Sequence, residues 1–337
     1  MPLWCCYDRC SRPERSDSGA RKGNPRMDGI DGNLTITRRR LLRWGAVAGL
    51  AAPAFGAGEV MAGAGGWRLR VRGLVARPGN LAIGDLQRLG DQSVAAVLER
   101  AGTGEASRAV WTGVPLRAVL DRAGVREDAI AVVTRGDDGH QRTIALRDLP
   151  AAGPLLAWAR DGEALSSAQG GPIRLIVPGW VAEASVKGVA GLELVDRLPR
   201  GRALSDPAER RLHPLREMPP RAVILTPGED DVVPPGVRQI RGQAWSGYAP
   251  VERVAVTVDG GATWQDAEIV ERAGPRGWVV FRLAWDARPG PATLAARATD
   301  AFGLTQPLDV PERARGFLHN AVIPVRVVTS WRGSRDG

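Results

Sequence analysis

Cysteine is scarce in this sequence and confined to its first residues. Three cysteines occur among 337 residues, and all of them fall within the first ten positions, at Cys5, Cys6 and Cys10. The rest of the chain therefore has no disulfide, no thiolate metal ligand, no cysteine nucleophile and no C-x-x-C-H motif for haem attachment.

Histidine is equally rare, and the three histidines are far apart in sequence at His140, His213 and His319. This spacing disfavours a histidine-rich metal site. His213 lies in a stretch rich in proline and charge, so we interpret it as a solvated linker residue.

Basic charge is present but not concentrated in the body of the chain. The formal net charge is +9, and residues 1–56 hold 10 Lys/Arg against 5 Asp/Glu, so about half of the excess belongs to the N-terminal leader. No basic run follows, which argues against a nucleic-acid partner. The hydrophobic content of 44% is ordinary for a globular protein, and the length allows two domains.

The leader, residues 1–65, is predicted to be an unstructured segment followed by an export signal. Arg38, Arg39 and Arg40 precede an apolar, Ala/Gly-rich run over residues 44–57, with small residues near 54–64 as cleavage sites. This layout resembles a twin-arginine signal and predicts a periplasmic protein, with Met1 or Met27 as the start. The run is shorter than the roughly 20 apolar residues of a membrane span. The alternative, an amphipathic helix, is disfavoured because the run has no polar face.

Lysine is almost absent, since only Lys22 and Lys187 occur among 46 basic residues. Lys187 follows an apolar stretch, residues 173–177, that is typical of a buried strand opening into a Pro178-Gly179 turn. Lysine offers a compact ammonium where arginine offers a planar fork. Its use here favours a site that holds an anion; the alternative is a surface lysine that arose by chance.

Residues 66–200 are predicted to form a first domain of the α+β class. Strands are expected over residues 67–75, 129–134, 143–146 and 173–177, with helices over 83–89 and 116–123. These elements mix without a regular βαβ repeat, which disfavours a doubly wound sheet. No dinucleotide fingerprint, P-loop or G-x-S-x-G elbow occurs.

The order of motifs in this domain resembles the molybdopterin-binding domain of the sulfite oxidase family. The motifs are Trp111-x-Gly113-Val114-Pro115-Leu116, Asp161-Gly162-Glu163, the Gly-Pro strand over residues 171–179, and Ser185-Val186-Lys187. The resemblance implies molybdopterin carrying molybdenum as the cofactor, with Arg174, Ser185 and Lys187 holding the pterin and its phosphate. The residue chemistry agrees, because a phosphate dianion suits an ammonium, a guanidinium and a hydroxyl donor together.

The chain departs from the family pattern at the metal. Where the family has a C-A-G-N segment with the molybdenum-ligating cysteine, this sequence has Arg100-Ala101-Gly102-Thr103. Arg100 therefore stands at the ligand position, where a guanidinium cannot replace a thiolate. Gln169, Ala184 and Gly188 stand where the family has histidine, arginine and tryptophan. The family's early Arg-Asn-His segment has no counterpart before Trp67. If a metal site persists, we expect Arg100 to line its pocket as an anion-binding cation.

Residues 201–220 are predicted to be a linker, residues 221–330 an antiparallel β-sandwich and residues 331–337 a tail. Strands are expected over 222–225, 237–245, 251–258, 263–269, 278–285, 293–298 and 321–328. The Asp259-Gly260-Gly261-x-Thr263-Trp264 turn and later motifs resemble the immunoglobulin-like dimerisation domain of sulfite oxidases. Four tryptophans are interpreted as sandwich core rather than a binding surface: Trp245, Trp264, Trp278 and Trp285.

The sequence leaves three functions open. The first, implied by the resemblance, is an exported molybdopterin-dependent oxidoreductase that oxidises sulfite or sulfane sulfur, passes electrons to an external c-type cytochrome and forms homodimers through its C-terminal domain. The second is a metal-free relative that acts as an exported partner subunit or anion-binding module. The third, an immunoglobulin-like adhesion protein, accounts only for the second half. None of them includes nucleic-acid binding or a stable membrane span.

Overall fold

The computed structural model describes residues 66–100, 104–149, 153–198, 217–309 and 320–331. The predicted leader and export signal, most of the predicted linker and nearly all of the tail lie outside the described residues. All described residues belong to one compact unit. In this part of the chain no helix is both long enough and apolar enough to cross a bilayer.

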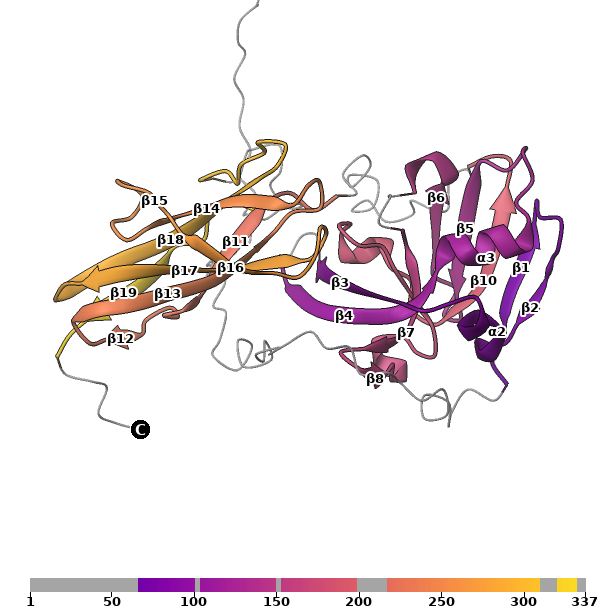
Figure 1. Cartoon of the computed structure of the whole chain (residues 1–337), viewed down its shortest axis with the longest axis horizontal. Coiled ribbons are helices and arrows are strands. Elements are labelled where there is room, and N and C mark those ends of the chain that lie inside the picture. The colour runs from indigo at the N-terminus through magenta and orange to yellow at the C-terminus, as the bar shows by residue number, and fades with distance from the viewer. Residues whose placement is uncertain (1–65, 101–103, 150–152, 199–216, 310–319, 332–337) are drawn as a thin grey trace, which may run out of the picture. The chain divides into compact units, whose positions relative to one another are not determined.

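The first half of the described chain contains two sheets (Figure 1). One has the order β2 (Gly79–Leu81), β1 (Leu69–Gly73), β10 (Val189–Val195), β5 (Ala131–Gly136) and β6 (Gln141–Ala145). The other has the order β3 (Gln92–Glu99), β4 (Ala106–Pro115), β7 (Leu155–Arg160) and β8 (Glu163–Ala164), with β9 (Arg174–Ile176) paired to β7. Only β1 and β10 pair in parallel within these sheets.

Two α-helices and three short 3-10 helices connect these strands. The α-helices are α2 (Ile83–Arg88) and α3 (Leu116–Ala123), and the 3-10 helices are η2 (Leu146–Asp148), η3 (Ser167–Gln169) and η4 (Ala182–Ala184). Helix α3 buries Leu116, Val119 and Leu120 on one face, the spacing of an amphipathic helix. It ends at Gly124, whose left-handed backbone forms the expected C-terminal cap.

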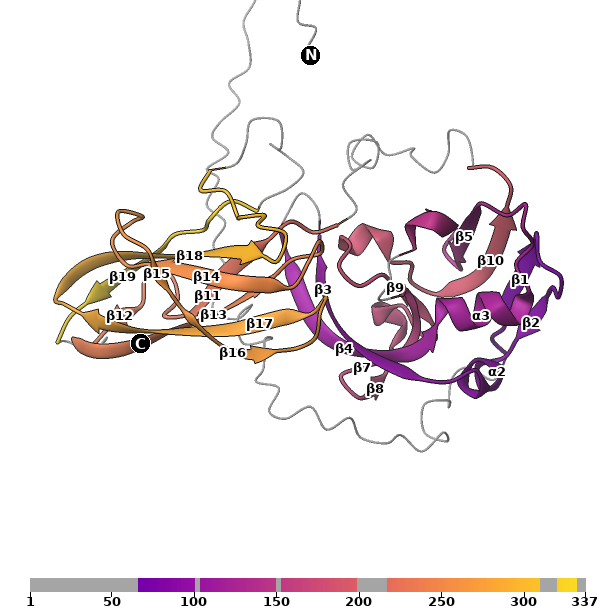
Figure 2. The same cartoon turned by 45° about the horizontal axis from the view of Figure 1, so that its top comes forward.

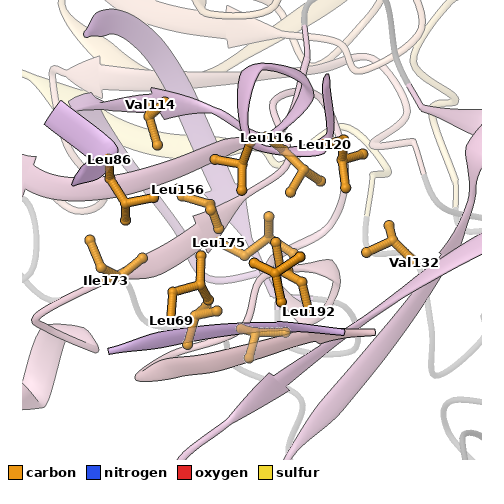
Figure 3. Close-up of a cluster of buried hydrophobic side chains, with 14 of the residues drawn as sticks. Leu69, Leu86, Val114, Leu116, Leu120, Val132, Leu156, Ile173, Leu175 and Leu192 are labelled. Carbon is orange, nitrogen blue, oxygen red and sulfur yellow. The ribbon is translucent and has the colours of Figure 1, made fainter. Parts of the chain in front are cut away.

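A single hydrophobic core joins the two sheets and α3. Figure 3 shows its side chains gathered between them, among them Leu69 and Leu192 from one sheet and Leu156 and Leu175 from the other. The fully buried Leu175 places β9 in this core. The core therefore fixes the strand on which Arg174 lies.

The second half is a sandwich of two antiparallel-paired layers (Figure 2). One sheet has the order β11 (Arg221–Thr226), β13 (Gly236–Trp245), β17 (Trp278–Ala287) and β16 (Glu268–Arg272). The other has the order β12 (Val232–Val233), β19 (Val325–Thr329), β18 (Gly290–Asp300), β14 (Val251–Thr257) and β15 (Gln265–Asp266). Only the short β12 joins its neighbour in parallel. The fold class predicted from the sequence, a mixed first domain followed by an immunoglobulin-like sandwich, is confirmed.

The strand expected over residues 263–269 is wrong in detail, because the chain first makes a side-chain-stabilised turn. The carboxylate of Asp259 accepts hydrogen bonds from the Thr257 hydroxyl at 2.7 Å and from the Thr263 backbone at 2.9 Å. These bonds lower the pKa of Asp259 to about 2, with those from Thr263 first among the causes. Trp264 is only half-buried and donates from Nε1 to the Gly261 carbonyl, so its prediction as a core residue was also wrong.

Trp285 lies in the sandwich core as predicted, whereas Trp245 and Trp278 pack elsewhere. They share a cluster with Val97 of β3 and with Val181, which belong to the first half of the chain. Their burial therefore stabilises a contact between segments far apart in sequence, which periodicity within the sandwich could not predict.

A buried ion pair lies beside this cluster. The Arg221 guanidinium donates to Glu99 at 2.6 Å, with side-chain exposures of 5% and 8%, and also to the Gly104 carbonyl at 2.9 Å. The Trp245 indole donates to the second oxygen of Glu99 at 2.8 Å. The end of β3 and the turn after it are thus bound to β11 and β13.

Replacing Glu99 with glutamine would leave the Arg221 charge buried without its carboxylate. Removing one partner of a buried ion pair costs about 3–5 kcal/mol. We expect Glu99→Gln to lower the free energy of unfolding in urea by about that amount. The control Arg253→Gln removes an exposed pair with Asp266 and should change it by about 1 kcal/mol or less. Equal effects of the two variants would contradict a stabilising role for the buried pair.

Candidate functional site

The candidate site is built on one face of β9 and the segment that returns beside it. Leu175 and Val186 form an antiparallel bridge, with backbone hydrogen bonds of 2.8 and 3.3 Å. This register puts Arg174 opposite Lys187. Because side chains alternate along extended chain, both lie on the face away from the buried Leu175 and Val186. Ser185, opposite Ile176, belongs to the same face.

Both cations reach the same short turn. Arg174 Nη1 donates to the Gln169 carbonyl at 3.1 Å, and Lys187 Nζ donates to the Ala168 carbonyl at 2.9 Å. The two acceptors are neighbours in η3. The charged ends of Arg174 and Lys187 are therefore brought to one place.

Gly170 makes this approach possible. A Cβ at this position would lie 2.7 Å from Cβ and Cγ of Lys187, and the backbone has φ +93. A larger residue would both strain the turn and displace the lysine.

Neither cation has a carboxylate partner in the part of the chain that the structure describes. Burial and, to a smaller extent, the nearby charge of Arg160 together lower the pKa of Arg174 to about 10. The group still carries its proton at neutral pH, so a half-buried positive charge faces a carbonyl dipole and the Trp111 ring, with no carboxylate beside it in the described chain. Such a charge favours binding of an anion.

Several buried polar atoms at the site have no hydrogen-bond partner among the residues that the structure describes. Arg174 Nε and Ser185 Oγ are buried and unpaired, and so is Nε1 of Trp111, whose ring lies 5.3 Å from the Arg174 guanidinium. Buried donors without partners are rare in folded proteins, and a missing ligand is one explanation for them. The donor set is a guanidinium, an ammonium and a hydroxyl, which fits the phosphate end of a phosphorylated pterin.

Arg100 is not brought to these residues. It is exposed in the β3–β4 turn, where its amide donates to Glu105 O at 2.8 Å and its carbonyl accepts from Gly104 at 3.0 Å. Across the sheet, Arg174 of β9 pairs with Ala157 of β7, which pairs with Gly113 of β4, which in turn pairs with Gln92 of β3. Gln92 is therefore the residue of β3 in line with Arg174. Arg100 follows Gln92 by eight residues, which is about 25 Å of extended strand.

No group of three histidine, cysteine, aspartate or glutamate side chains in the described ranges is arranged to hold a metal ion. The guanidinium, ammonium and hydroxyl of the site fit the anionic end of a molybdopterin. The described residues include no cysteine and therefore offer no thiolate ligand for molybdenum.

Sequence reasoning missed Arg160 and the role of Trp111. The Arg160 guanidinium lies 5.6 Å from the Trp111 ring, beside Arg174. The W-x-G-V-P-L motif could have pointed to Trp111. Nothing in the local sequence marks Arg160, because its placement depends on how β7 pairs with β4.

Comparisons with known proteins agree with this architecture. The family model for the oxidoreductase molybdopterin binding domain matches residues 57–202, and that for the Mo-co oxidoreductase dimerisation domain matches residues 213–330. The sulfite oxidase of Gallus gallus is 29% identical over 306 residues, covering 76% of this chain and 67% of that protein. A nitrate reductase [NAD(P)H] of Hordeum vulgare is 29% identical over 273 residues, covering 67% of this chain and 30% of that protein.

A solved structure shows the same fold. The sulfane dehydrogenase SoxCD from Paracoccus pantotrophus superposes with a TM-score of 0.70 at 27% identity, covering 77% of this chain and 74% of that one. The chain spans between 30% and 67% of the length of the two curated relatives named above. With both of its domains matched in order, the chain belongs to the sulfite oxidase family.

Proposed function

We propose that this chain binds molybdopterin by its phosphate-bearing end and acts as an exported oxidoreductase of the sulfite oxidase type, with sulfite or sulfane sulfur as substrate. The observation that carries the proposal is the pair of cations, Arg174 and Lys187, which meet at η3 without a carboxylate partner in the described chain. Family membership supports the cofactor. The likeness to a sulfane dehydrogenase supports the substrate class.

In this proposal the chain's own residues position the cofactor. Lys187 contributes a point charge, Arg174 a planar pair of donors and Ser185 a buried hydroxyl, and together they hold a dianionic phosphate. Molybdopterin, when bound, would supply a molybdenum centre able to accept two electrons from a sulfur substrate. This sequence has no C-x-x-C-H motif for covalent haem attachment, and we propose an external c-type cytochrome as the electron acceptor.

Two further parts of the proposal concern assembly and location. The match to a dimerisation domain supports a homodimer formed through the sandwich. The twin-arginine layout of the leader supports export to the periplasm.

A second candidate is a metal-free relative that serves as an exported partner subunit or anion-binding module. The position of Arg100 favours this candidate. Arg100, at the family's thiolate position, is exposed. It lies about 25 Å along β3 from Gln92, the residue of that strand in line with Arg174. This candidate retains the phosphate site and loses the metal.

Cofactor content and turnover separate the two candidates. We expect full-length protein from molybdenum-replete cells to contain molybdenum and pterin in equimolar amounts, measured by elemental analysis and by pterin fluorescence after denaturation. Sulfite or a sulfane sulfur compound should then reduce added cytochrome c. Metal-free protein without turnover would overturn the oxidoreductase and favour the second candidate.

The variant Arg100→Cys tests whether the family's ligand position still reaches the site. Because this residue lies in the exposed β3–β4 turn, we expect the new thiol to leave molybdenum content and turnover unchanged. Arg100→Ser is the control for loss of the guanidinium. A rise in molybdenum content for the cysteine variant alone would show that residue 100 does lie at the metal.

A further inference from the structure

Strand β7 carries an irregularity that changes which side chains share the face of Arg174. Thr112 of β4 pairs with Ala159, but the next residue, Gly113, pairs with Ala157, so Trp158 has no opposite residue. Trp158 and Ala159 both pack into the large core of the first half, whereas Ala157 packs on the other side of the sheet. This is the geometry of a β-bulge, which re-aims the side chains that follow it.

The bulge brings Arg160 into line with Trp111. Arg160 pairs directly with Trp111 across the strands, and its guanidinium lies 5.6 Å from the indole centroid. The Arg174 guanidinium lies 5.3 Å from the same ring. One nearly fully buried indole therefore holds two guanidinium groups by cation–π contact.

Gly113 is required for this register. A Cβ at Gly113 would lie 2.2 Å from the Leu156 carbonyl and 2.5 Å from Cα of Ala157. Only glycine permits β4 and β7 to approach this closely beside the bulge.

Arg160 remains available to a ligand. Its Nε lies 3.4 Å from Asp161 and its side chain is 30% exposed. The other oxygen of that carboxylate accepts a 2.8 Å hydrogen bond from the Val110 amide. The charge of Arg160 disfavours the charged form of Arg174, and an anion bound near both groups would relieve that repulsion.

We propose that Arg160 and Arg174, held on Trp111, form a two-guanidinium site for a phosphate monoester dianion, with Lys187 and Ser185 completing its donors. Gln169 and Ala184 are uncharged, whereas the family pattern has histidine and arginine at these two positions. Arg160 supplies a positive charge in place of the arginine that is lost. The inference rests on the proposed function, because both use Arg174, Ser185 and Lys187 to hold the phosphate. It adds a residue that the family pattern does not provide, and it holds for the phosphate of a pterin or for a free phosphate.

The test compares Arg160→Gln, Arg160→Lys and the control Arg253→Gln in the full-length protein. Two quantities are measured: pterin content after denaturation, and the affinity of any pterin-free fraction for inorganic phosphate at constant ionic strength by calorimetry. Loss of a charge-assisted contact should weaken phosphate binding by about ten- to a hundredfold in Arg160→Gln. Arg160→Lys should be intermediate, because it keeps the charge but loses the planar fork. Arg253→Gln should match the wild type.

The outcomes separate this inference from the proposed function. If the wild type contains no pterin but binds phosphate, and Arg160→Gln binds phosphate more weakly, the anion site is sustained and molybdopterin is removed as its ligand. If the wild type carries pterin, its content should fall in Arg160→Gln and not in Arg253→Gln. Equal phosphate affinity and equal pterin content in wild type and Arg160→Gln would overturn the inference, as would a pterin-free wild type that binds no phosphate.

Discussion

The site depends on two positive charges that the described chain brings together without neutralising them. Arg174 and Lys187 reach neighbouring carbonyls of η3, and neither has a carboxylate partner among the described residues. Carbonyl dipoles balance a half-buried charge only in part, as the lowered pKa of Arg174 shows. The large core beneath β9 keeps this arrangement in place, because Leu175 and Val186 are fully buried there. The core of the first half thus fixes a face on which two cations lie without a carboxylate partner in the described chain.

The end of the same sheet at Glu99 contacts the sandwich and does not contribute to the positive face. Glu99, at the end of β3, is bound to Arg221 and Trp245, which lie on strands of the sandwich. Arg100 follows immediately and is exposed. The end of β3 where the family pattern places its metal ligand thus provides contacts between distant segments, and the positive face lies elsewhere on the sheet. This division explains how the chain keeps the family's fold without a thiolate among the described residues.

Local pattern predicted much of the fold because local chemistry determines it. The spacing of Leu116, Val119 and Leu120 followed by Gly124 predicted α3, and the alternating strands predicted the sandwich. The Gly-Pro strand and the Ser-Val-Lys segment predicted the three residues that now share one face. What failed depends on distant pairing. The bulge that aims Arg160 at Trp111 requires β4 beside β7, and the burial of Trp245 requires contact with β3. Trp264 was misplaced because the hydrogen bonds of Asp259 create a turn within the expected strand.

Native mass spectrometry of the full-length protein tests the central claim most directly. The account predicts wild-type protein carrying a phosphorylated pterin, or inorganic phosphate once it is added, and an Arg174→Gln, Lys187→Gln double variant that appears at the mass of the bare chain. A double variant that folds and retains the same bound mass as the wild type would contradict the account, because the two unneutralised cations would then not be what holds the anion.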